Sequence, residues 1–248
     1  MRIPALVEID SDGHRAGVRP EDPRLPEVAR ALGQSLLGVM THAGESYNCA
    51  TTAAIEAMAT QEREAVTSAA ALLREHGHEA PVVSVGSTPT ATFARSFAGV
   101  TEVRVGVYVF QDLVMAGLGV CSVNDIALSV LATVIGHQRE KSWLITDAGW
   151  MAMSRDRGTA RQKVDQGYGL VCDTAGRPIE GLVVRDANQE HGIVARRDAG
   201  AIDLSRFPIG SRLRVLPNHA CATAAQFAEY QLLREGRPAG AWERFGGW

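Results

Sequence analysis

The sequence contains little lysine, few cysteines and no long hydrophobic run. Lysine occurs only at Lys141 and Lys163, so arginine supplies nearly all of the positive charge. Lysine and arginine together number 25 against 28 acidic residues, which gives a formal net charge of −3. This balance does not favour the basic surface that nucleic-acid binding requires, and we expect no nucleic-acid partner.

The 4 cysteines are widely scattered and form no CxxC pair, which excludes a dense disulfide framework. The longest apolar stretches are too short to cross a bilayer, and the first residues carry no signal-peptide pattern. We therefore expect a cytoplasmic protein without membrane association. Because 46% of the residues are hydrophobic, the chain has enough apolar surface to fold as a globular protein.

The first part of the chain, residues 1–115, alternates between strand and helix patterns. Strands are expected over residues 5–9, 37–40, 81–85 and 103–110, and helices over 23–36 and 50–75. This alternation predicts parallel βα units.

The second part, residues 116–248, consists of short β-type runs separated by turn signals. The runs cover residues 126–135, 142–146, 168–172, 182–185, 192–196 and 211–216. No long helical segment separates them, so the pattern predicts an antiparallel β-domain, either a sheet or a small barrel. The fold class is thus α/β followed by all-β.

Four parallel strands make about half of a (β/α)8 barrel of the TIM type, which alone needs about 250 residues. We therefore expect residues 1–115 to form a partial barrel, about its second half. Its open edge would leave Leu6, Val7, Ile9 and Met40 without packing partners on one side. The sequence then implies that the product starts upstream of Met1, that a partner chain completes the barrel, or that the chain is a remnant.

His219 and Cys221 form the strongest local motif, shortly after the β-type run predicted over residues 211–216. In an extended segment, side chains two residues apart lie on one face. Imidazole and thiolate suit Zn²⁺ better than Mg²⁺, and two protein ligands leave coordination positions open, as in catalytic sites. Alternatively, His219 caps a turn and Cys221 is a buried thiol.

Three weaker motifs follow predicted strands in the first part. Residues 85–90, with small and hydroxyl side chains, can hold a phosphate or form a βα turn with an N-cap. His42 and Tyr47 can face a ligand or simply be half-exposed. Arg104 and Gly106 are expected to point the same way on a strand, where Gly106 allows close approach of a ligand.

In this order, the motifs resemble the D-serine dehydratase and D-threonine aldolase family, pyridoxal-phosphate enzymes built like alanine racemase. Such enzymes have an N-terminal barrel and a C-terminal β-domain. The resemblance covers nearly the whole chain and rests on residues 7–18, 42–47, 86–90, 106–110, 147–149, 154–158, 189–192 and 219–221.

The resemblance implies two binding sites. The residues implied around pyridoxal 5'-phosphate are Tyr47, Gly86, Ser87, Thr88, Gly106, Val107 and Tyr108, with Arg15 and Arg104 near its ring. His219 and Cys221 match the metal ligands of the dehydratase branch, with Zn²⁺ expected and Mn²⁺ or Mg²⁺ as alternatives. There the metal polarises the β-hydroxyl of the substrate as a Lewis acid, and the cofactor is the electron sink.

The sequence departs from the family at its Schiff-base lysine, which lies in a His-x-Lys-Thr context near the first barrel strand. This chain has no such motif, and Lys141 and Lys163 lie in polar stretches typical of solvated loops. No catalytic residue is therefore identified, and we expect this chain alone to be inactive. Glu45 is a smaller departure, since a histidine often stands there in relatives.

The resemblance implies a lyase acting on small D-3-hydroxy amino acids, similar to D-serine dehydratase and yielding a 2-oxo acid and ammonia. Cys221, rather than an aspartate, favours this over a D-threonine aldolase that yields glycine and an aldehyde. An alternative of another class is a non-catalytic fragment or subunit that binds cofactor or metal. The resemblance also implies a homodimer.

Overall fold

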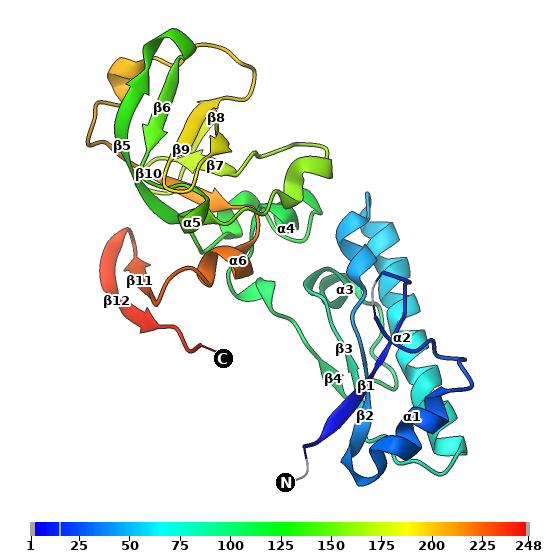
Figure 1. The fold of residues 1–248 in the computed structure, drawn as a ribbon. Coiled ribbons are helices and arrows are strands. Elements are labelled where there is room, and N and C mark those ends of the chain that lie inside the picture. The colour runs from blue at the N-terminus through cyan, green and yellow to red at the C-terminus, as the bar shows by residue number, and fades with distance from the viewer. Residues whose placement is uncertain (1–2, 15, 247–248) are drawn as a thin grey trace. The chain divides into compact units, whose positions relative to one another are not determined.

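A computed structural model describes residues 3–14 and 16–246, and the chain divides into two compact units. The first unit comprises residues 1–108 and 118–120, and the second comprises residues 109–117 and 121–248. Figure 1 shows helices and a parallel sheet in the first unit and mainly strands in the second. The predicted combination of an α/β part and an all-β part is confirmed.

The first unit is built on a four-stranded parallel sheet, in which the strands neighbour each other in chain order. Its strands are β1 (Ala5–Ile9), β2 (Leu36–Thr41), β3 (Val82–Val85) and β4 (Glu102–Val103). Its helices are α1 (Leu25–Leu32), α2 (Thr52–Glu75) and α3 (Thr88–Phe93). Parallel strands joined by helices are successive βα units, as predicted.

Helices α1 and α2 cover one face of this sheet (Figure 1). Val7 and Ile9 are buried in the core between the sheet and these helices. The expectation that both lack packing partners on one side is therefore wrong. Alternate residues of a strand point to opposite faces, and these two point to the helices. Leu6 and Met40 are only half-buried.

Two predicted elements of the first unit are shorter than expected. The helix predicted over residues 23–36 ends at Leu32, because Gly33 adopts a positive φ of 53° and a short 3-10 turn follows. The strand predicted over residues 103–110 is wrong beyond Val103. Its partner β3 ends at Val85, so the chain has no strand to pair with and forms the 3-10 helix η3 (Val107–Val109).

The second unit contains a closed six-stranded barrel, in which every neighbouring pair is antiparallel. Its strands are β5 (Val130–Gln138), β6 (Trp143–Thr146), β7 (Gly169–Cys172), β8 (Pro178–Ala187), β9 (Gly192–Arg196) and β10 (Arg212–Pro217). Val134, Leu144 and Val194 lie fully buried in its core. The predicted antiparallel β-domain is thus confirmed, and of the two predicted forms the structure has the small barrel.

Short helices and a hairpin complete the second unit. The helices are α4 (Leu113–Gly117), α5 (Trp150–Met153) and α6 (Ala220–Ala224). The hairpin of β11 (Glu229–Arg234) and β12 (Arg237–Glu243) was not predicted, because its strands are almost wholly exposed and show no buried apolar face.

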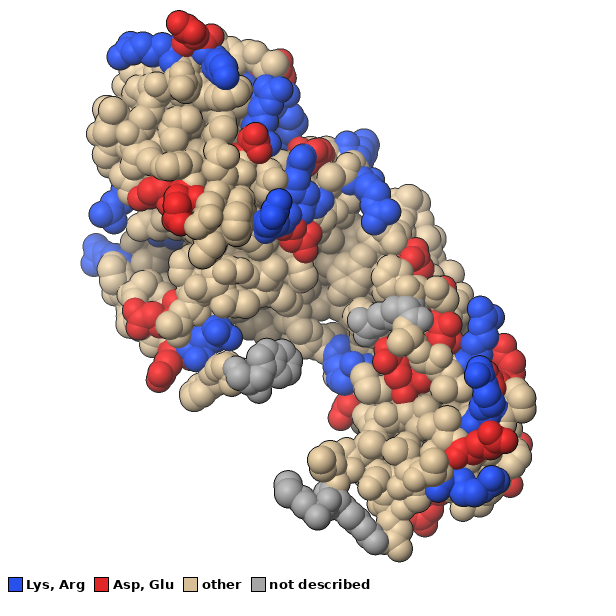
Figure 2. Space-filling view, viewed as in Figure 1, with Lys and Arg blue, Asp and Glu red and all other residues tan. Residues whose placement is uncertain are grey.

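The described surface carries charged side chains of both signs. On the face shown in Figure 2, basic and acidic side chains of the described residues are intermixed. Among the helices of the described part, none is long and apolar enough to span a bilayer.

Candidate cofactor and metal sites

The carboxyl ends of β2 and β3 bring two predicted segments together in the first unit. His42 follows β2, and its Nδ1 hydrogen-bonds to the carbonyl oxygen of Gly86, which follows β3. The His42 ring also stacks on Tyr47, with ring centroids 6.1 Å apart and planes at 30°. Parallel strands place their carboxyl ends at one sheet edge, so segments 44 residues apart in the chain become neighbours.

Ser87 and Thr88 begin α3 but differ in their hydrogen bonding. The Ser87 hydroxyl accepts a hydrogen bond from the Thr90 amide at 3.2 Å and lies 3.1 Å from the Ser46 hydroxyl. Ser87 is therefore the N-cap of α3. In contrast, the Thr88 hydroxyl is buried and has no hydrogen-bond partner within the described chain. Such a group costs free energy unless a ligand satisfies it.

Glu62 is a buried carboxylate that supports both segments from helix α2. Its Oε1 accepts hydrogen bonds from the amides of Ala43 at 3.0 Å and Gly86 at 3.1 Å. Its Oε2 accepts one from the Thr90 hydroxyl at 2.7 Å. The Gly86 amide is thus already engaged. The sequence did not indicate Glu62, because it lies among polar residues that resemble a solvated helix face.

The segment after β4 is not the strand that was predicted over residues 103–110. Because β4 ends at Val103, Arg104 and Gly106 do not lie on a strand, and the predicted common orientation has no basis. A Cβ atom added to Gly106 would meet no atom within 4 Å, so this backbone is open to a ligand. Val107 is buried, whereas Tyr108 is 54% exposed.

Arg104 connects the neighbouring strand ends. Its Nε donates to the Ser84 hydroxyl at 2.8 Å, and its Nη2 donates to the Thr41 carbonyl oxygen. Arg104 thereby links β2 and β3 at their carboxyl ends. Arg15, the other arginine expected near the cofactor ring, lies outside the described residues.

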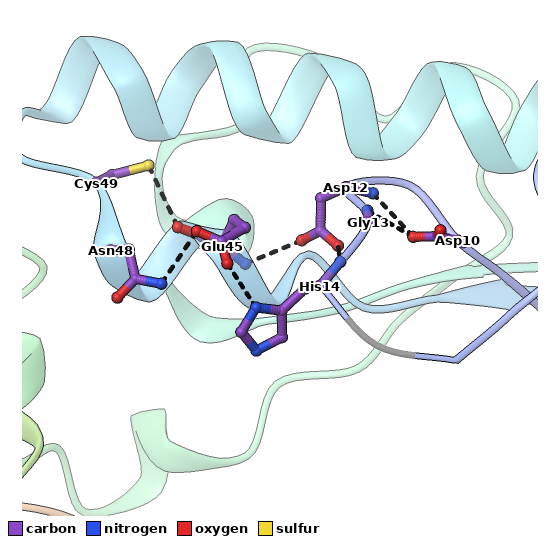
Figure 3. Close-up of polar contacts among 7 residues, drawn as sticks. All are labelled: Asp10, Asp12, Gly13, His14, Glu45, Asn48 and Cys49. Carbon is purple, nitrogen blue, oxygen red and sulfur yellow. Dashed lines mark hydrogen bonds and ion pairs between the residues drawn. The ribbon is translucent and has the colours of Figure 1, made fainter.

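A polar network holds the loop after β1 against the 3-10 helix η2 (Gly44–Asn48), which carries Tyr47 (Figure 3). Asp12 Oδ2 accepts a hydrogen bond from the Glu45 amide at 2.9 Å. His14 Nδ1 lies 2.5 Å from Glu45 Oε1, and Asn48 donates to Glu45 Oε2 at 3.0 Å. Both members of the His14–Glu45 pair are about 40% exposed. The network fixes η2 at this sheet edge.

His219 and Cys221 meet at the start of α6 in the second unit. The segment was predicted to be extended, but it enters a helix: His219 is the N-cap of α6, and Cys221 lies in its first turn. His219 Nδ1 lies 2.7 Å from Asp156 Oδ2. Two hydrogen bonds, the stronger effect from Asp156 and the weaker from Cys221, raise the pKa of His219 to about 10. The same contact with His219 lowers the pKa of Asp156.

Buried polar groups fix the backbone on both sides of this pair. Asp112 Oδ2 accepts from the Ala220 amide at 2.9 Å, and Thr223 donates its hydroxyl hydrogen to the Met153 carbonyl oxygen at 2.5 Å. The Asn218 side chain accepts from the Thr159 hydroxyl at 2.7 Å. These bonds turn the chain from β10 into α6, which brings His219 and Cys221 together despite the helical start.

The donor set of this pair fits an open metal site. A carboxylate only accepts hydrogen bonds, so the Asp156 contact places a proton on Nδ1 of His219. With the pKa raised to about 10, the ring also carries a proton on Nε2, and a metal would bind there in place of that proton. Cys221 is exposed and can supply a thiolate. Within the described part of the chain, no three His, Cys, Asp or Glu side chains are grouped to hold a metal. Two protein ligands would leave positions for substrate or water.

Both lysines lie in the second unit and are exposed. Lys141 lies over the Trp143 ring, 4.6 Å from its centroid. Lys163 follows the short 3-10 helix over residues 158–161. Neither belongs to the strand ends of the first unit, where Gly86, Thr88 and Gly106 lie.

Comparisons with known proteins find matches to both parts of the chain. Residues 1–113 match the model of the alanine racemase N-terminal domain, and residues 127–233 match that of a putative serine dehydratase domain. D-threo-3-hydroxyaspartate dehydratase of Delftia sp. is 59% identical over 248 residues, covering 98% of this chain and 65% of the relative. D-serine dehydratase of Dictyostelium discoideum is 31% identical, covering 92% of this chain and 60% of the relative.

A solved structure has the same fold. It is D-threo-3-hydroxyaspartate dehydratase, described as a cysteine-to-alanine mutant in the metal-free form, with a TM-score of 0.92 and 58% identity. The match covers 98% of this chain and 66% of that chain. The chain thus spans about two thirds or less of the length of these relatives.

Proposed function

Since the chain belongs to the alanine racemase-like family of fold-type III pyridoxal-phosphate enzymes that includes the D-serine dehydratases, we propose that it contributes the phosphate and metal sites of a lyase acting on a small D-3-hydroxy amino acid. The reaction would remove water and yield a 2-oxo acid and ammonia. The observation that carries this proposal is the His219–Cys221 pair, with Nδ1 of His219 held by Asp156. The substrate class is supported by the 59% identity to a D-threo-3-hydroxyaspartate dehydratase.

The first unit fits the phosphate group of pyridoxal phosphate. The buried Thr88 hydroxyl lacks a partner among the described residues and would donate to a phosphate oxygen. The open backbone at Gly106 leaves room for that group, and Val107 follows it. The Gly86 amide donates to Glu62, so Gly86 would act by allowing close packing: a Cβ there would lie 2.2 Å from the Arg104 carbonyl oxygen.

The remaining residues of the proposed site have supporting roles. Ser87 would orient Thr88 by capping α3. Tyr47, stacked on His42, would lie beside the cofactor, as would the exposed ring of Tyr108. When bound, pyridoxal phosphate withdraws electrons from the α-carbon of an amino acid.

The metal proposed at His219 and Cys221 is Zn²⁺. Nitrogen and sulfur donors suit Zn²⁺ better than Mn²⁺ or Mg²⁺, which prefer oxygen ligands. A Lewis acid at this position would polarise a substrate β-hydroxyl and make it a better leaving group. His219 would bind through Nε2, while Asp156 holds the proton on Nδ1.

We also propose that the four-stranded sheet is a section of a (β/α)8 barrel and that the protein is a cytoplasmic homodimer. The chain-order parallel strands, with α1 and α2 on one face, support the barrel proposal. This chain alone would not turn over substrate, because both of its lysines are exposed in the second unit. Native mass spectrometry should show two chains per particle, and a single chain would contradict the dimer.

The decisive experiment is a product assay on protein purified from its native host, with its intact mass measured first. D-threo-3-hydroxyaspartate, D-serine and D-threonine are supplied separately. Formation of a 2-oxo acid and ammonia by a protein heavier than 26.5 kDa supports the proposal. The same products at 26.5 kDa would support the lyase but contradict the expected inactivity of this chain alone. Glycine and an aldehyde would instead identify an aldolase. No product, with a mass of 26.5 kDa, would favour the non-catalytic binding protein.

A further inference from the structure

We propose that Asp156 is the positioning residue for the metal at His219 and Cys221: it fixes the imidazole so that Nε2 faces the metal. This inference rests on the proposed metal site and adds a residue that lies 63 positions away from His219 in the chain. Asp156 is half-buried and lies between α5 and a short 3-10 helix.

The direct contact carries the inference. Asp156 Oδ2 lies 2.7 Å from His219 Nδ1, the length of a charge-assisted hydrogen bond. Since the carboxylate can only accept, the ring keeps its proton on Nδ1, and the lone pair of neutral imidazole is on Nε2. A carboxylate in this position also makes the ring a stronger metal ligand.

The backbone around Asp156 is held in place. The Asp156 amide donates to the Ser154 hydroxyl at 3.2 Å, and Ser154 itself has a positive φ of 84°. The Asp156 carbonyl oxygen accepts from the Asn218 side chain at 3.4 Å. Asn218 directly precedes His219, so the carboxylate and the imidazole are connected by backbone contacts as well as by their own hydrogen bond.

The two arginines beside Asp156 are directed elsewhere. The Arg155 guanidinium lies over the Trp150 ring, 5.1 Å from its centroid. Arg157 pairs with Asp165 at 2.7 Å and lies over the Tyr168 ring. Among the described residues, neither guanidinium forms an ion pair with Asp156. The ion pair of the Asp156 carboxylate is instead with His219.

The test compares the Zn²⁺ affinity of the chain with those of D156A and D156N, by competition against a chromophoric chelator. We expect D156A to bind Zn²⁺ about 10–100-fold more weakly, the usual effect of losing such a partner. The amide side chain in D156N retains an oxygen that can accept from Nδ1 but carries no charge, so this variant should fall between D156A and the unchanged chain. The control is D198N, which removes an exposed carboxylate paired with Arg196 and should bind as the unchanged chain does.

Substitution of Co²⁺ gives a second readout that does not depend on activity. The visible bands of Co²⁺ report ligand geometry, so they should shift in D156A while the thiolate-to-metal band from Cys221 remains. An unshifted spectrum, with unchanged Zn²⁺ affinity in both Asp156 variants, would overturn the inference. Should D156A not fold by circular dichroism, D156N alone decides.

The variants H219A and C221A separate this inference from the proposed site. Loss of metal in both, with unchanged affinity in the Asp156 variants, would refute the role of Asp156 and retain the metal site. Unchanged affinity in H219A and C221A would refute the metal site itself.

Discussion

At the residue scale, the adjacent hydroxyl groups of Ser87 and Thr88 have different roles. The residue types predicted either a phosphate site or an N-cap in this segment, and the family resemblance implied that both residues hold a phosphate. In the structure, the Ser87 hydroxyl is engaged as the cap of α3, whereas the buried Thr88 hydroxyl has no partner in the described chain. Hydrogen bonding thus separates a supporting residue from one that is free to bind.

Replacing Thr88 by valine tests this difference. Valine has nearly the same shape, and the hydroxyl it removes makes no hydrogen bond within the described residues, so the thermal midpoint of the free chain should stay the same or rise. Binding of pyridoxal phosphate, measured by calorimetry, should weaken about tenfold, or ~1.4 kcal/mol.

The matched control is T90V, because the Thr90 hydroxyl donates to Glu62. This variant should lower the thermal midpoint. Unchanged cofactor affinity in T88V would contradict the assignment of Thr88 to the phosphate site.

At the element scale, buried carboxylates connect segments that are distant in the chain. Glu62 of α2 joins the loops after β2 and β3, and Asp112 joins the starts of α4 and α6. Each accepts hydrogen bonds from backbone amides that burial would otherwise leave unsatisfied. The geometry of both candidate sites therefore depends on residues outside the sequence motifs.

Glu62→Ala should destabilise the chain by on the order of 3 kcal/mol, since it leaves the amides of Ala43 and Gly86 without an acceptor and removes one acceptor of the Thr90 hydroxyl. Glu62→Gln retains one acceptor oxygen and should have a smaller effect. Urea denaturation measures both. Glu64→Ala is the control, because Glu64 is 64% exposed and pairs with Arg63 at the surface. Equal stability of the Glu62 and Glu64 variants would show that the Glu62 contacts do not support the fold.

Asp112→Asn should destabilise the second unit by about 1–3 kcal/mol. The two carboxylate oxygens accept from the amides of Met115 and Ala220, and an asparagine would turn a donor toward one of them. The urea midpoint should fall at an unchanged slope. D198N, at an exposed surface pair, should leave the midpoint almost unchanged. A D112N midpoint equal to that of D198N would contradict this role.

At the scale of the whole molecule, we expect that neither lysine of the chain bonds to a cofactor in the first unit. The residues proposed to bind cofactor lie in the first unit, whereas Lys141 and Lys163 are exposed in the second. We expect bound pyridoxal phosphate to leave the chain on gel filtration, and borohydride to fix none of it covalently. Retained visible absorbance that disappears in K141A or K163A would contradict this expectation.

The elements of both units could be predicted largely from the sequence, because the spacing of apolar residues reflects which face of a strand or helix is buried. β9 and most of α2 match their predicted ranges. The fourth strand was overextended, because its length depends on β3, which ends at Val85. No local pattern reports where a partner strand ends.

By itself, the sequence determined the order of strands and helices, the change from an α/β to an all-β part, and the residue types that suit a phosphate and a metal. Only the tertiary structure decided how those residues act. It brought Asp156 to His219, Glu62 to Gly86 and Asp112 to Ala220, and it left the Thr88 hydroxyl unpaired among the described residues. These partners are 24 to 108 residues apart in the chain. Local spacing carries no information about hydrogen bonds across such distances, because they form only when the packed elements bring donor and acceptor together.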